Sequence, residues 1–136
     1  MKITPPNPLI NSHQNYKEKI IKKRPNLELD EEATEGNTLL RFHGTTLSCK
    51  LSEKLSHCGE GSCVVCSISL GGFKISFSGK GPLSSKGFGQ RFGDGLYFTS
   101  CSSKANDYGA NTEKYLGVGI RSVLICQVVA GIKIKK

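Results

Sequence analysis

A histidine, a glycine and a threonine follow one another where the first strongly apolar run of the chain ends. Thr38-Leu39-Leu40-Arg41-Phe42 leads directly into His43-Gly44-Thr45. An imidazole placed here can donate a hydrogen bond to a sugar hydroxyl, and a residue without a Cβ lets a flat ring approach the backbone, whose N–H and C=O can pair with an amide. Taken alone, a histidine before a glycine is more often a loop or core residue.

Two tyrosines stand further along the chain. Gly93-Asp94-Gly95 leads into Leu96-Tyr97-Phe98, and Tyr108 comes eleven residues after Tyr97, at the end of an expected short helix. Two tyrosines so placed can sandwich an aromatic ring such as nicotinamide. The alternative is that both pack against the core and keep a polar tip in water.

The order of these pieces carries more information than each piece alone. Phe-His-Gly-Thr, Gly-Asp-Gly-Leu-Tyr-Phe, Ser-Lys-Ala-Asn-Asp-Tyr and Val-Leu-Ile-Cys-Gln-Val-Val-Ala-Gly follow one another over residues 38–132. This order resembles the catalytic domain of poly(ADP-ribose) polymerases. The resemblance implies an α+β fold of the ADP-ribosyltransferase type, with two small, mostly antiparallel sheets packed at a steep angle around an NAD cleft. It also implies transfer of ADP-ribose from NAD to a protein or nucleic-acid acceptor, with release of nicotinamide.

The resemblance also assigns roles. The residues expected to bind NAD are His43, Gly44, Thr45, Tyr97, Lys104 and Tyr108, with His43 and Tyr97 as the catalytic pair. His43 would contact the adenosine-side ribose, Gly44 would pair with the nicotinamide amide, and Tyr108 would stack on the nicotinamide ring. Tyr97 would line the nicotinamide ribose, and Lys104 matches a family lysine. Where the family has an amide-binding serine this chain has Ala105, a loss of about 1 kcal/mol of binding.

The family's catalytic glutamate has no evident counterpart. That glutamate is expected on a strand beyond Lys136, so the sequence predicts a domain truncated before its C-terminal strand, either a fragment or a true pseudoenzyme. The acids after His43 stand in other contexts: Glu53, Glu60, Asp94, Asp107 and Glu113. Glu113, in a loop after Tyr108, is the one conceivable substitute. Whether this chain is an active enzyme is therefore open at this point.

Four cysteines gather within eighteen residues, at Cys49, Cys58, Cys63 and Cys66. Cys63-Val64-Val65-Cys66 is a CxxC pair, the common half-site of tetrahedral zinc. Cys58 and Cys49 complete a four-thiolate set, with His57 as the alternative to Cys58. The pattern predicts a closed, structural zinc site, and four unrelated free thiols are the alternative. The remaining cysteines, Cys101 and Cys126, are expected to be buried thiols.

The elements that must position these residues are short. Strands are expected at 38–43 and 122–130, and the continuous apolar character of the second indicates burial on both faces. Short strands or turns are expected at 63–68 and 73–77, a glycine-hinged turn into a strand at 92–98, and a helix at 102–108 capped by Ser102 or Ser103. Loops are expected at 80–90 and 109–119.

Domain organisation follows from composition. Residues 1–37 are predicted to be a polar, poorly ordered tail or linker, with a short helix near 16–23 that Arg24-Pro25 would end. Residues 38–136 would form the partial ADP-ribosyltransferase domain, with a cysteine-rich insertion at 45–70. A small core with 7% aromatic residues and no tryptophan would benefit from a metal staple.

Charge and targeting signals narrow the class of protein. Residues 1–37 hold six Lys/Arg and six Asp/Glu, so the whole net charge of +8 lies in residues 38–136. A basic domain attracts dinucleotides, nucleic acid or acidic proteins. Pro5, Pro6 and Pro8 interrupt the place of a signal peptide, and no apolar run is long enough for a membrane span, so an intracellular protein, cytoplasmic or nuclear, is expected. Three hypotheses stay open: an ADP-ribosyltransferase, a pseudoenzyme that binds NAD or ADP-ribose, and a zinc-stapled binding module.

Overall fold

Two antiparallel strands form the centre of the molecule. The computed structural model describes residues 3–49, 57–58, 63–80, 92–109 and 121–133. Strand β1 (Thr38–Thr45) pairs with β2 (Ser122–Val129) along their whole length, with Leu39 opposite Val128 and His43 opposite Leu124. Both strands are rich in apolar and β-branched residues, which favour the extended backbone. The strands expected at 38–43 and 122–130 are confirmed.

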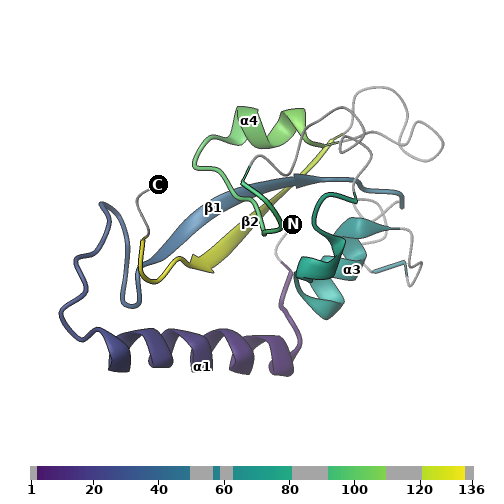
Figure 1. Ribbon diagram of the computed structural model, residues 1–136. Coiled ribbons are helices and arrows are strands. Elements are labelled where there is room, and N and C mark those ends of the chain that lie inside the picture. The colour runs from purple at the N-terminus through teal and green to yellow at the C-terminus, as the bar shows by residue number, and fades with distance from the viewer. Residues whose placement is uncertain (1–2, 50–56, 59–62, 81–91, 110–120, 134–136) are drawn as a thin grey trace.

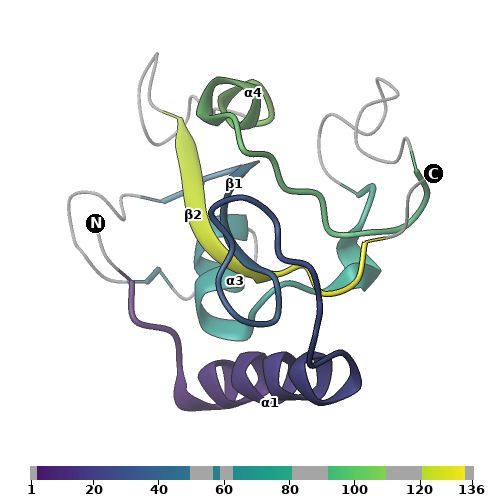
Figure 2. The same ribbon diagram turned by 90° about the vertical axis from the view of Figure 1, so that its left-hand side faces the viewer.

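Helices lie on both sides of this pair. Helix α1 (Asn7–Lys23) lies on one side and helix α4 (Ser102–Asp107) on the other, as the two ribbon views show (Figures 1 and 2). Helix α3 (Val64–Gly71) and the 3-10 helix η1 (Ile75–Phe77) follow one another in the chain. The described part of the chain is therefore a small α+β domain, which confirms the fold class at that level.

Helix α1 begins at Asn7, well before the short helix expected near 16–23, within the segment expected to be a tail or linker. Pro8 lies in the first turn of the helix, where a backbone N–H has no partner within the helix, so its absence costs nothing. The positive charges of Lys22 and Lys23 in the last turn interact favourably with the negative end of the helix dipole. Arg24 ends the helix at the position before Pro25, as the sequence predicts. The buried Ile20 packs on Gly131, where an added Cβ would lie 3.2 Å from Ile20 Cδ1. This contact joins α1 to the end of β2.

Asn37 secures the entry into β1. It is 1% exposed and has a positive φ of 56°, a conformation that asparagine tolerates better than most residues. Its side-chain Nδ2 donates to the carbonyl of Gly131 over 3.1 Å, and its Oδ1 accepts the N–H of Asp30 over 3.0 Å. Two hydrogen bonds from one buried side chain therefore connect the turn before β1 to the chain after β2.

The faces of β2 differ from expectation. Ile125 is 69% exposed, and Gln127 is exposed as well, whereas Leu124 and Cys126 are half-buried. The expectation that β2 is buried on both faces is wrong, because alternate side chains of a strand point to opposite faces and one of these faces is open at Ile125.

The other edge of β1 meets the segment that carries Tyr97. Phe42 N–H donates to the carbonyl of Thr99 over 2.8 Å, and Thr99 N–H returns a bond of 3.0 Å to the carbonyl of Phe42. Residues 92–98 themselves form turns and irregular backbone, so the strand expected there is reduced to a single bridge at Thr99. This bridge still places the 97–99 segment beside β1.

The segments expected as short strands or turns at 63–68 and 73–77 are largely helical, because α3 begins at Val64 and η1 covers Ile75–Phe77. A short apolar run cannot be distinguished from a helix by periodicity alone. Here Cys63 and Cys66, three positions apart, both face the core and are 0% and 1% exposed, a spacing that one face of a helix provides. Gly72 ends α3 with a φ of 73°, and its N–H bonds the carbonyl of Ile68. Burial of both cysteines on one side therefore favours a helix over a strand in this segment.

Helix α4 agrees with expectation except at its start. The capping position is Cys101, with no capping hydrogen bond from its side chain, so the caps expected from Ser102 or Ser103 are wrong. Cys101 Sγ lies 3.0 Å from Ser103 Oγ. Cys101 is exposed rather than buried, because it precedes the helix on the solvent side. Cys126 is half-buried, and this burial raises the pKa of its thiol to about 11.

Candidate functional site

His43 lies near the end of β1 with its ring held on several sides. Its Nδ1 is 2.9 Å from the carbonyl oxygen of Tyr97. The ring centroid lies 4.9 Å from that of Phe73, edge to face, and 5.5 Å from that of Phe98. Phe73 and Phe98 also contact each other, with centroids 5.0 Å apart. His43 is therefore the polar member of a cluster of three aromatic rings.

The carbonyl of Tyr97 fixes the proton on the His43 ring. A carbonyl oxygen only accepts, so Nδ1 carries the hydrogen and donates it. Burial lowers the pKa of His43, and the bond to the Tyr97 carbonyl offsets this only in part. The ring is therefore neutral near pH 7, and its Nε2 is an acceptor. Such a ring can accept a hydrogen bond from a sugar hydroxyl, whereas the sequence had suggested a donor.

Gly44 is where α4 meets β1. A Cβ built on Gly44 would lie 1.7 Å from the carbonyl oxygen of Ala105 and 3.2 Å from the backbone nitrogen of Gly109. Ala105 is 1% exposed. No side chain fits between the two backbones, so the glycine permits the contact that seats α4. The space that the sequence assigned to a flat ring is taken here, on this side of Gly44, by α4 itself.

The remaining expected binding residues surround this contact. Lys104 is exposed on α4, and Tyr108 caps the end of α4 with 37% of its surface exposed. Tyr97 is half-buried, and its hydroxyl donates to the carbonyl of Gly93 in the same turn. The carbonyl of Thr45 accepts the hydroxyl of Ser122 over 2.7 Å. The structure thus joins His43 to the Tyr97 backbone and Gly44 to the helix that carries Lys104 and Tyr108.

Phe73 and Phe98 are the neighbours that sequence reasoning missed. Phe98 stands inside the quoted motif, directly after Tyr97, but received no role. Phe73 follows Gly71-Gly72 at the end of the cysteine-rich insertion. An aromatic residue directly after a glycine pair, at the point where an insertion rejoins the domain, is the signal that would have pointed to it.

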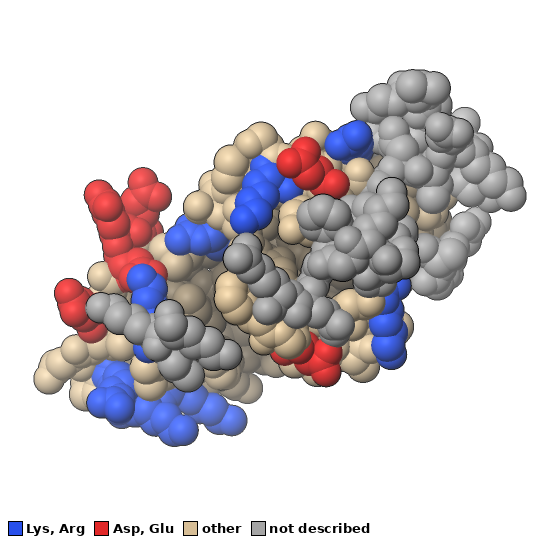
Figure 3. Space-filling view, turned by 45° about the horizontal axis from the view of Figure 1, so that its top comes forward, with Lys and Arg blue, Asp and Glu red and all other residues tan. Residues whose placement is uncertain are grey.

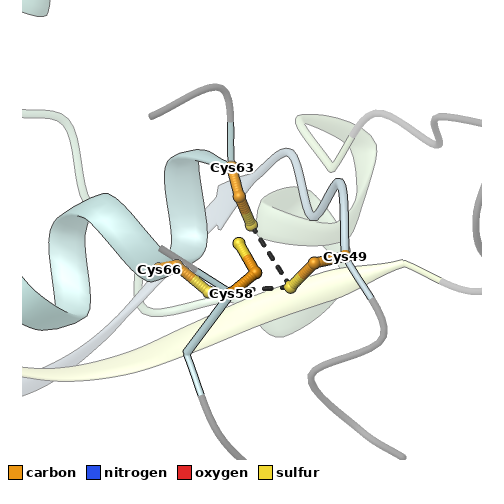
Figure 4. A group of neighbouring side chains, drawn as sticks. All are labelled: Cys49, Cys58, Cys63 and Cys66. Carbon is orange, nitrogen blue, oxygen red and sulfur yellow. Dashed lines mark hydrogen bonds between the residues drawn. The ribbon is translucent and has the colours of Figure 1, made fainter. Parts of the chain in front are cut away.

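The four cysteines form one cluster. Their sulfur atoms all lie within 4.8 Å of one another, and Figure 4 shows them pointing toward a common centre. Cys49 Sγ is 3.6 Å from both Cys63 Sγ and Cys66 Sγ. Sulfurs at the corners of a zinc tetrahedron with Zn–S bonds of about 2.3 Å lie about 3.8 Å apart, whereas a disulfide needs about 2.05 Å. The spacing matches a four-thiolate metal site, and all six cysteines are free.

The cluster is assembled from three segments. Cys63 and Cys66 come from the start of α3, Cys49 from the chain after β1, and Cys58 from the short described segment 57–58 (Figure 4). Cys58 is the half-buried member and the other three are buried. His57, the alternative ligand, is outside the group that the described residues form, so Cys58 takes the place.

Backbone N–H groups approach two of the sulfurs, those of Cys63 and Cys66. Burial, the largest influence, raises the pKa of the Cys63 thiol, but the N–H groups of Cys66 and Ser48 hydrogen-bond its sulfur and bring the pKa below its ordinary value. Burial raises the pKa of the Cys66 thiol, although a hydrogen bond from the N–H of Cys58 lowers it in part. Burial also raises the pKa of the Cys49 thiol. N–H groups aimed at sulfur stabilise thiolates, the form that binds a metal.

The cluster is also the apolar core of this end of the molecule. Cys49, Cys63 and Cys66 pack with Leu47 and Val65, and Leu124 of β2 covers the group. Buried apolar side chains in the described ranges are few, and three of the eight are cysteines: Ile20, Leu39, Leu47, Cys49, Cys63, Val65, Cys66 and Ala105. A core this small gains more from a bound metal than a large one would.

Charge is dispersed on the face that Figure 3 displays. Lys and Arg lie there in several separate groups with Asp and Glu between them. Among the acids considered as substitutes for a catalytic glutamate, Asp94 and Asp107 are described, whereas Glu53, Glu60 and Glu113 lie outside the described residues. The expected loops at 80–90 and 109–119 lie almost wholly outside them too.

Comparison with known proteins identifies no related family, so the function has to be argued from the geometry of the site. Within the described ranges, none of the helices has the length and apolar character needed to cross a membrane. No protein-family model matches the chain, and no curated protein matches it.

Proposed function

We propose that this chain binds NAD at the end of β1 and acts as an ADP-ribosyltransferase of the poly(ADP-ribose) polymerase type. One observation carries the proposal. Sequence pieces that are more than fifty residues apart meet at one place, because Tyr97 holds the ring of His43 and α4 rests on Gly44. An accidental match of short motifs gives no reason for such convergence.

The chemistry suits the residues. The bond between C1′ of the ribose and the nicotinamide nitrogen breaks, and its electron pair leaves with nicotinamide. The acceptor then bonds to C1′ and loses a proton. The transition state resembles an oxocarbenium ion, so fixing the ring and the ribose removes much of the barrier.

Each residue has a defined part in this proposal. Neutral His43 accepts a ribose hydroxyl at Nε2, while its Nδ1 stays bonded to Tyr97. The backbone of Gly44 pairs with the amide of nicotinamide, and the exposed ring of Tyr108 stacks on the nicotinamide ring. Exposed Lys104 meets the negative charge of the pyrophosphate or the ribose hydroxyls. The two-sheet cleft of the family belongs to the same proposal.

The metal at the four cysteines is proposed to be zinc. Four cysteine sulfurs within 4.8 Å of one another favour Zn²⁺ over the harder Mg²⁺ and Ca²⁺, which prefer oxygen ligands. All four positions are filled by protein, so the role is structural and no open position is left for a reacting group. The site contributes folding free energy when it is loaded.

Calorimetric titration of the zinc-loaded chain with NAD tests the proposal. We expect saturable heat that His43→Ala removes, with His13→Ala on α1 as the matched histidine control that keeps it. Nicotinamide release, followed by chromatography on the same samples, then separates a transferase from a pseudoenzyme. Absence of heat from folded, zinc-loaded protein would contradict NAD binding.

The zinc-stapled binding module is the second candidate, and the cysteine cluster favours it. It predicts binding to DNA or RNA whose affinity falls steeply with salt concentration, as release of counterions requires. A flat salt dependence would count against it. On the face that Figure 3 displays, Lys and Arg lie in separate groups and not in one continuous patch, which gives this candidate less support.

A further inference from the structure

The metal centre and His43 are connected through two separate stretches of chain. One runs from His43 along the end of β1 to Cys49. The other runs from Cys63 and Cys66 along α3 to Phe73, which contacts the His43 ring edge to face. The two stretches meet at the sulfur cluster at one end and at the His43–Phe73 contact at the other. The cysteine cluster and His43 are therefore linked twice, once along each stretch.

We propose that metal bound by the four cysteines sets the position of α3, and that α3 holds His43 in place through Phe73. Phe73 is then a positioning residue for His43, and the ligand site at the end of β1 is complete only in the metal-loaded protein. The part that concerns NAD rests on the proposed function. The part that concerns His43 does not.

Helix α3 is suited to transmit this constraint. Two of the four sulfurs come from its first turn, so the metal fixes where the helix begins and how it is turned about its axis. The N–H of Val65 also donates to the carbonyl of Thr46 over 3.3 Å, just beyond β1. These ties fix the start of α3 against the chain that follows His43.

Phe73 lies just after the C-terminal end of α3, and Gly72 connects the two. Gly72 adopts a φ of 73°, and an added Cβ would lie 2.9 Å from Leu9 Cδ2 of α1. Gly72 therefore packs against Leu9 of α1, and a residue with a side chain at this position would be strained by the positive φ and by the contact with Leu9. A helix of two turns followed at once by a fixed turn leaves Phe73 little freedom once the start of α3 is fixed.

Other contacts of His43 come from a segment that carries none of the four cysteines. Tyr97 and Phe98 reach the ring from the segment that bridges β1 at Thr99, far from the cysteines in sequence. Loss of the metal should therefore release Phe73 and leave Phe98 and the Tyr97 carbonyl in place. This selectivity separates the proposal from general unfolding.

Nuclear magnetic resonance of the isotope-labelled full chain tests the coupling directly. In zinc-loaded protein we expect nuclear Overhauser contacts from the His43 ring to both Phe73 and Phe98. After removal of zinc, and in Cys66→Ser, the contact to Phe73 should be lost, while those to Phe98 and between Leu39 and Val128 persist. Cys126→Ser, a cysteine of β2 outside the cluster, is the matched control and should keep all three.

A variant that leaves the metal site intact completes the test. Phe73→Leu should retain zinc and the fold but weaken NAD binding by up to about tenfold, the equivalent of one aromatic pair. Phe77→Leu, an exposed phenylalanine of η1, should leave the affinity unchanged.

Three results would overturn the proposal. One is a His43–Phe73 contact that survives removal of zinc, and another is loss of every contact together, which would make the metal a general staple. The third is a Phe73→Leu protein with wild-type affinity for NAD. If the wild-type chain binds no NAD, the proposed function fails, and the contacts of His43 with and without zinc still decide the coupling.

Discussion

The cysteine centre and the end of β1 reach their arrangement by different routes. All four cysteines lie between residues 49 and 66, so the candidate metal site is encoded in one short stretch. The site around His43 needs residues 73, 97, 98 and 105 as well, which come together only when the domain folds. A local site is visible in sequence spacing, whereas a dispersed site is visible only as an order of motifs. The variants below test whether the two sites also differ in what they contribute to stability and binding.

Loss of a metal ligand should have the largest effect. Cys63→Ser places a hard hydroxyl in the most buried of the four positions and should lower the free energy of unfolding by about 3–4 kcal/mol, with β1 and β2 still paired. Urea unfolding with zinc content measured on the same samples checks this, with Cys126→Ser as control. An unchanged midpoint in Cys63→Ser would show that the cluster is four free thiols.

Gly44→Ala should be next. The added methyl group would overlap the Ala105 carbonyl, so α4 must move off β1 at a cost of about 2–3 kcal/mol. Gly95→Ala is the matched control, because its Cβ would meet nothing closer than 3.7 Å from Tyr97. Thermal unfolding of the two variants should separate them clearly. Equal melting temperatures would contradict the seating of α4 on Gly44.

The pH dependence of stability should report the burial of His43. Its pKa in the folded chain lies below the ordinary value of 6.5, so below pH 6.5 the unfolded chain binds the proton first and the free energy of unfolding falls. Against His43→Gln, which cannot titrate, the wild type should lose at most about 1.4 kcal/mol per pH unit there. Urea unfolding at pH 7.5 and 5.5 measures the difference. A wild type that gains stability relative to the variant on acidification would contradict a buried, neutral ring.

Lys104→Ala should have the smallest effect on stability, within about 0.5 kcal/mol, because the side chain is exposed on α4. Its affinity for NAD should nevertheless fall several-fold, since the ammonium group no longer meets the ligand. Lys19→Ala on α1 is the control for a general loss of charge. Equal affinities of the two variants would remove Lys104 from the ligand site.

Sequence reasoning predicted the two strands, helix α4 and the cysteine cluster, but not the contacts that surround His43. The two strands, helix α4 and the four-cysteine set follow from local features: β-branched runs, a short polar helix and the CxxC spacing. The helix at 64–71 could not be deduced from Val64-Val65, because short apolar runs suit both helix and strand until burial decides. In the same way, the exposed Ile125 of β2 depends on what covers each face of the sheet, which a single strand does not encode.

The aromatic support of His43 shows the same limit. Phe73 lies thirty residues from His43, and its contact exists because α3 turns at Gly72. The tautomer of His43 depends on a carbonyl of Tyr97, a backbone group that carries no sequence signal. Residue types indicated which side chains could do chemistry, and the fold determined which backbone groups orient them.

The most direct test of the central claim maps NAD onto the folded, zinc-loaded chain by the shifts of its backbone amide resonances. We expect saturable shifts at His43, Gly44 and Thr45 of β1, at Lys104 of α4 and at Tyr108 directly after it, with the resonances of α1 unmoved. Shifts that are absent, or that fall on α1 and leave the end of β1 unchanged, would contradict an NAD site at His43.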